Sequence, residues 1–232
     1  MWQALRAELH PQGVEVVTVA LDSGGAEAAG PWIDAAGPEH PSLIDAEHRL
    51  DAAVGVVNVP TGVWVDEEGM LVRPPEVAHP GTSVLRDMIA KHGIPTDGPE
   101  ILRDQILAAS KIRVDPEAYG AALRDWAEKG AASQYALSPD EVVERSRPVP
   151  REVSEAAAHF ELGVALRADG ELEAARRHFR VAHQLDPENW TYKRQAWAFE
   201  DPFQGPTEHY DSDWLSEIET RGHDTYYPLP EL

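Results

Sequence analysis

A proline inside a valine-rich segment constrains the fold of this chain more than any other feature of its sequence. Residues 55–69 read GVVNVPTGVWVDEEG, with Pro60 just before the apolar run 63–65. Because proline cannot donate a hydrogen bond to a sheet, Pro60 belongs at the start of a strand, in a tight bend where a cis peptide bond is expected. The sequence Asp66-Glu67-Glu68-Gly69 predicts a turn into a second strand at 70–72. The segment therefore predicts a hairpin that a proline opens.

Helix and strand patterns surround this hairpin. Apolar residues at helical spacing predict helices at 1–9, 26–36, 48–54 and 83–92. The apolar run 14–21 predicts a strand that is buried on both faces of a parallel sheet. We expect Trp32 and Leu50 to point into the core, and Asp45 to cap the helix that follows it.

Three segments together resemble the thioredoxin-like proteins of the ResA and TlpA type. Val59-Pro60-Thr61 and the turn ending at Gly69 are similar to the cis-proline hairpin of that family. Residues 13–22 are similar to its second strand, and residues 41–45 to the segment before the helix that leads to the proline. The resemblance implies an α/β thioredoxin-like domain at 1–95, in which Val59, Pro60 and Thr61 bind an extended peptide in the manner of strand addition.

The chain departs from this family in one respect, because it contains no cysteine. Thiol-disulfide exchange requires a thiolate, so the chain as written has no catalytic residue and is redox-inactive. The family's first strand and its Cys-x-x-Cys turn have no counterpart after Met1. We therefore expect an N-terminally incomplete domain, or another element in the place of that strand.

Two functions follow from this departure. The first is a thiol-disulfide oxidoreductase or antioxidant relative whose cysteine segment lies upstream of Met1. The second is a non-catalytic protein-binding module that uses the Pro60 loop and the helical region. The residues leave both open, and with them the question of whether the protein is an enzyme.

Residues 96–150 predict a helical connector. Helices are expected at 101–112 and 116–129, the second opened by Asp115 as N-cap and Pro116 in the first turn. The sequence Ser138-Pro139-Asp140-Glu141 has the spacing of a capping box and predicts the start of another helix.

Residues 151–200 have the pattern of a tetratricopeptide repeat, which is two antiparallel helices. The break is expected at Asp169-Gly170, Pro187 is expected to begin the next helix, and 190–199 would cover the pair. Residues 201–232 are expected to form a tail packed on the body. The positions that carry the pattern are Leu162, Gly163, Gly170, Ala175, Phe179, Ala182 and Pro187.

Composition narrows the choice of partner. The chain has 41 acidic and 20 basic residues, a formal net charge of -21 that repels nucleic acid phosphates. No apolar run is long enough for a membrane segment, which points to a cytoplasmic protein as written. We predict a protein or peptide partner and no cofactor. His159, His178 and His183 are expected on helix surfaces. No metal site is expected there, because His178 and His183 are five positions apart and do not share one helix face.

Overall fold

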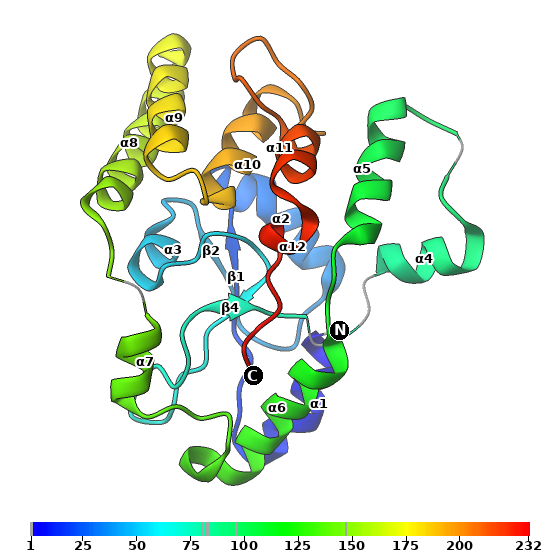
Figure 1. Cartoon of the computed structure of the whole chain (residues 1–232), viewed down its shortest axis with the longest axis vertical. Coiled ribbons are helices and arrows are strands. Elements are labelled where there is room, and N and C mark those ends of the chain that lie inside the picture. Colours follow the sequence, from blue (N-terminus) through cyan, green and yellow to red (C-terminus); the bar gives the residue numbers. More distant parts are fainter. Residues whose placement is uncertain (1, 80, 82–83, 96, 147) are drawn as a thin grey trace.

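The computed structural model describes residues 2–79, 81, 84–95, 97–146 and 148–232, so Met1 and Ser83, which the predicted helices include, lie outside the described residues (Figure 1). Most of the described chain is helical. The helices are α1 (Trp2–Leu9), α2 (Gly25–Ala36), α3 (Arg49–Val54), α4 (Val84–His92), α5 (Glu100–Lys111), α6 (Pro116–Lys129), α7 (Pro139–Arg145), α8 (Arg151–Ala168), α9 (Leu172–Leu185), α10 (Trp190–Glu200), α11 (Trp214–Arg221) and α12 (His223–Tyr226). The strands are β1 (Thr18–Leu21), β2 (Ser42–Asp45), β3 (Thr61–Gly62) and β4 (Glu76–Val77), and 3₁₀ turns occupy His10–Gln12 and Gly130–Ala132.

The described strands of residues 1–95 form two separate sheets of two strands each. β1 pairs with β2 in parallel, with Leu21 opposite Asp45, and β3 pairs with β4 antiparallel. The described residues before β1 form α1 and a 3₁₀ turn, so they supply no strand that would join the two pairs. The described part of the chain therefore has no continuous sheet of the thioredoxin kind. The structure supports the predicted helical region and gives no support to the predicted α/β thioredoxin-like domain.

The strand predicted at 14–21 is shorter and less buried than expected. Only Thr18–Leu21 is a strand, all four of its residues are partly exposed, and Val17 is 51% exposed. β1 has β2 along one edge only, whereas a strand buried on both faces needs a covered sheet around it. Two predictions of core residues are also wrong, because Trp32 is 79% exposed and Leu50 is 42% exposed.

The hairpin after Pro60 forms, and the Val59–Pro60 peptide bond is cis. Asp66 Oδ1 accepts the backbone N–H groups of Glu68 and Met70, and Gly69 has a φ of 80°, in the region that favours glycine. An isolated bridge joins Val65 to Leu71. The predicted turn is thus confirmed, although the named strands that flank it, β3 and β4, lie further from the turn than predicted.

A small core lies between α1, α6 and the hairpin. Trp64 is 3% exposed, stacks on Trp126 and donates from Nε1 to Tyr119 Oη at 3.1 Å. α6 begins as predicted, with Asp115 accepting the N–H of Ala118, and the capping box at the start of α7 is also present. The buried apolar residues of this core are Leu5, Leu9, Trp64, Val72, Ala78, Tyr119, Ala122 and Leu123.

The helical region from α8 onward holds a larger, aromatic core. α8 and α9 lie side by side at the opposite end of the molecule from α1 and α6 (Figure 1). They approach closely at Gly163, where an added Cβ would lie 2.6 Å from the Phe179 ring. α10 begins at Trp190 with Asn189 as N-cap, not at Pro187, because the Asn189 side chain accepts the N–H of the first turn. The large buried side chains are Phe160, Phe179, Trp190, Tyr192, Trp197, Tyr210, Trp214, Ile218, Tyr226 and Tyr227.

Candidate functional site

The Pro60 loop, residues 57–61, is bonded directly to the helical region. The carbonyl of Val57 accepts the backbone N–H groups of Trp190 and Thr191 at 2.6 and 3.2 Å. Asn58 Nδ2 donates to the carbonyl of Tyr226 at 2.8 Å, and Asn58 is 4% exposed. These contacts fix the loop against the start of α10 and the end of α12. Segments far apart in the sequence are therefore held in contact by buried groups.

The three predicted peptide-binding residues lie together in this loop, with Val59 36% exposed. The loop holds its own shape through hydrogen bonds. Val59 N–H donates to Asn58 Oδ1 at 2.9 Å, and Thr61 Oγ1 donates to the Asn58 carbonyl at 2.6 Å. The Pro60 carbonyl accepts the N–H of Ala78 at 3.1 Å. An extended peptide would have to replace one of these bonds or use the remaining backbone groups, and the peptide-binding role of Val59, Pro60 and Thr61 stays a prediction.

A buried histidine and carboxylate lie next to the loop. His48 and Asp51 are 2% and 1% exposed, and His48 Nδ1 lies 2.8 Å from Asp51 Oδ2. Thr191 Oγ1 lies 3.2 Å from the same carboxylate oxygen and 2.6 Å from Asn189 Oδ1, which is the nearer acceptor for its single proton. The His48 ring meets Phe160 edge-on at 4.8 Å between centroids. The cluster joins α3 to α8 and α10.

This cluster contains the residue types of a catalytic triad but not its arrangement. A triad places the hydroxyl on the imidazole, so that the histidine can take its proton. Here the threonine hydroxyl faces Asn189 Oδ1 and the carboxylate but not the imidazole, and all three groups are buried. The arrangement stabilises the contact between segments and does not activate a nucleophile. Asp45, predicted to cap the helix that follows it, accepts the backbone N–H of Leu50 at 2.7 Å, although the N-cap position of α3 is His48. No signal in the sequence indicated that His48 pairs with Asp51, three residues further on.

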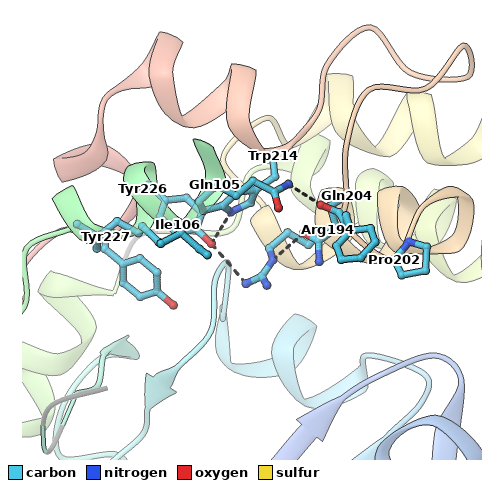
Figure 2. Close-up of a pocket in the computed structure, with 11 residues that line it drawn as sticks. Gln105, Ile106, Arg194, Pro202, Gln204, Trp214, Tyr226 and Tyr227 are labelled. Carbon is cyan, nitrogen blue, oxygen red and sulfur yellow. Dashed lines mark hydrogen bonds between the residues drawn. The ribbon is translucent and has the colours of Figure 1, made fainter. Parts of the chain in front are cut away.

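A pocket of about 370 Å³ opens between α5, α10 and the tail. Figure 2 shows the Arg194 guanidinium among aromatic side chains that α11, α12 and their flanks supply. Arg194 Nε donates to Gln204 Oε1 at 3.1 Å, and Nη1 to Tyr226 Oη at 3.4 Å. The pocket is lined by Gln105, Ile106, Ala109, Ile112, Arg194, Pro202, Phe203, Gln204, Trp214, Tyr226 and Tyr227. The sequence carries no signal for it, because its walls come from segments up to about a hundred positions apart, as expected for a tertiary site.

The three histidines of α8 and α9 differ in their surroundings. His159 and His178 stack, with their Nδ1 atoms 2.7 Å apart, and burial together with the His159 charge lowers the pKa of His178. His183 was predicted on a helix surface, but its ring packs against Trp197 and Tyr210. Burial lowers its pKa to about 4. Among the residues that the structure describes, no group of three or more histidine, aspartate or glutamate side chains could hold a metal ion.

Comparison with known proteins identifies one part of the chain. Residues 156–189 match the family model of the tetratricopeptide repeat, which spans most of α8, all of α9 and the turn up to α10. Searches of curated proteins and of solved structures find no match. No helix of the described residues is long and apolar enough to cross a membrane. The predicted tetratricopeptide-like hairpin is therefore confirmed, and the thioredoxin-like relation of the first segment has no support from these comparisons.

Proposed function

We propose that the protein is a non-catalytic protein-binding module, which holds a polypeptide partner with the Pro60 loop and the helical region together. The match of residues 156–189 to the tetratricopeptide repeat carries this proposal, because such repeats commonly mediate contacts between proteins. One repeat presents little surface alone. The bonds from Val57 and Asn58 to α10 and α12 extend that surface with the loop.

The chemistry of the exposed loop supports a peptide ligand. Val57 and Val59 are 41% and 36% exposed and stand on either side of Asn58, whose side chain is buried. They offer apolar contacts on a loop that internal hydrogen bonds already order, which lowers the entropy cost of binding. The net charge of -21 favours a partner whose contacting surface is neutral or basic.

The absence of cysteine from the sequence supports the same proposal. Without cysteine the chain cannot perform thiol-disulfide exchange, and the His48, Asp51 and Thr191 cluster lacks the geometry of a nucleophile site. A distant thioredoxin-like relation of residues 1–95 stays a proposal. Its favouring observation is the order of elements: α1, the parallel strands β1 and β2 joined through α2, then α3 and the Pro60 hairpin.

The test begins with a random peptide library displayed on phage and selected on the immobilised chain. Affinities of the enriched peptides are then measured by fluorescence anisotropy. Val59→Asp should weaken binding about tenfold or more, because it places a charge where an apolar contact is made. Val143→Asp is the matched control, since Val143 is 72% exposed on α7, away from the loop. Failure to enrich any peptide, or equal affinities for Val59→Asp and wild type, contradicts the proposal.

A further inference from the structure

The pocket between α5, α10 and the tail differs in charge from the rest of the molecule. Its lining residues include one arginine and, within the described chain, no aspartate or glutamate. The whole chain has about twice as many acidic as basic residues, 41 against 20. A cavity with a single cation and no carboxylate is therefore unlike the remaining surface, and its field favours an anion.

Arg194 also differs from the neighbouring cations. Arg176 forms a two-pronged ion pair with Glu200, and Lys193 lies 3.0 Å from Glu217. Arg194, in the same helix as Lys193, bonds to the neutral oxygens of Gln204 and Tyr226 instead, and no described carboxylate pairs with it. These neutral bonds orient the guanidinium and leave its charge uncompensated. A planar guanidinium held in this way is suited to bind a carboxylate through two parallel hydrogen bonds.

Tyr226 adds a second donor beside the arginine. Its hydroxyl oxygen accepts from Trp214 Nε1 at 3.1 Å and from Arg194 Nη1 at 3.4 Å. A phenol oxygen has two acceptor positions and one proton, so the proton of Tyr226 is left to donate. Within the described chain, no hydrogen bond from this hydroxyl to an acceptor is present, and Figure 2 shows it next to the guanidinium. The two groups together form a donor pair for one anionic ligand.

The remaining walls are apolar and aromatic. Phe203, Trp214, Tyr227 and Ile106 line the same pocket as Arg194. The volume of about 370 Å³ lies at the lower end of the range for small-molecule sites. Aromatic walls around one charged anchor select a ligand with a flat apolar body and a charged head.

We propose that this pocket binds an aromatic carboxylate, with Arg194 and Tyr226 holding the carboxylate and the aromatic side chains enclosing the ring. Two sources share this chemistry: a free arylalkanoic acid, and the C-terminal aromatic residue of a peptide. The site is independent of the proposed use of the Pro60 loop for a protein partner.

Isothermal titration calorimetry on the full chain tests the site with phenylpropionate and its uncharged analogue phenylpropanol. Wild type should bind the acid about ten- to a hundredfold more tightly than the alcohol, as a hydrogen-bonded charge pair requires. Arg194→Gln should abolish this preference. Arg177→Gln removes the same charge from an exposed arginine of α9 that lies outside the pocket. This control variant should keep the preference for the acid.

A second pair of probes separates the two sources. An N-acetylated tripeptide ending in phenylalanine is compared with the same peptide as its C-terminal amide. Binding of the peptide acid but not the amide assigns the site to a peptide C-terminus, whereas binding of phenylpropionate alone assigns it to a free acid.

The proposal is overturned if neither acid binds wild type, if acid and alcohol bind equally, or if Arg194→Gln keeps the preference. Should Arg194→Gln fail to fold by circular dichroism, the acid and alcohol comparison on wild type still decides. Tyr226→Phe then replaces Arg194→Gln as the test variant. It should lower the affinity for the acid about three- to tenfold and leave the affinity for the alcohol unchanged.

Discussion

Acidification should destabilise this protein through His183, whose ring is enclosed in the helical core. The ring lies 6.2 Å from Trp197 and 5.4 Å from Tyr210 between centroids, and its Nε2 is buried without a hydrogen-bond partner among the described residues. Burial, reinforced by the nearby charge of Lys193, lowers its pKa from 6.5 to about 4. The folded protein therefore resists protonation of this ring.

The direction of the effect follows from the two protonation states. In the unfolded chain His183 binds a proton near its ordinary pKa of 6.5, while in the folded chain it does so only near 4. Below 6.5 the unfolded state therefore binds more protons, and the free energy of unfolding falls with pH. One pKa unit corresponds to about 1.4 kcal/mol. Protonation of His183 on unfolding should therefore lower the free energy of unfolding by about 2 kcal/mol when the pH falls from about 8 to about 5.

Urea unfolding followed by tryptophan fluorescence at a series of pH values measures this cost. His183→Phe keeps an aromatic ring against Trp197 and Tyr210 but cannot titrate, so its curve of stability against pH should be flatter than that of wild type by about 2 kcal/mol over this range. His92→Phe, at an exposed position on α4, is the control and should follow wild type. Parallel curves for wild type and His183→Phe would refute the reasoning.

Three further substitutions test how the helical region is held together. Gly163→Ala should lower the free energy of unfolding by about 1–3 kcal/mol in urea titration, because the new Cβ meets the Phe179 ring at 2.6 Å; unchanged stability would show that the helices can separate freely. Glu200→Gln should lower the free energy of unfolding by about 1–3 kcal/mol near neutral pH and by less in acid. The reason is that Arg176 lowers the pKa of the Glu200 carboxyl, so the stabilisation by the ionised carboxylate disappears as the pH falls. An equal loss of stability in acid contradicts this account. Asn58→Ala should speed amide exchange of the Pro60 loop, which loses its bonds to the Tyr226 carbonyl and within the loop; unaltered exchange would argue against its anchoring role.

Local signals in the sequence predicted local structure well. The N-cap at Asp115, the capping box at Ser138 and the turn ending at Gly69 each depend on contacts within four residues, and all three are present. The small residue Gly163 and the large Phe179 predicted the close approach of α8 and α9, because repeat spacing encodes which faces of the two helices meet.

Tertiary features were beyond such signals. Trp32 is a large aromatic residue of the kind that usually lies in a core, but it is 79% exposed on α2, and the spacing along that helix did not show which face is covered. Asp51 is a carboxylic side chain but is buried, because His48 in the same segment and Thr191 from α10 both approach it. The pocket around Arg194 likewise depends on how α5 and the tail dock against α10, and no local pattern records that docking.

The central claim is that the Pro60 loop and the helical region form one binding surface for a polypeptide. Hydrogen-deuterium exchange with and without a peptide selected on the chain measures this most directly. The account predicts that the peptide slows exchange both in residues 57–61 and in the helical region, which comprises the repeat helices α8 and α9 and the helix α10 that is bonded to the loop. Protection confined to one of these two segments, or found only elsewhere in the molecule, would contradict it.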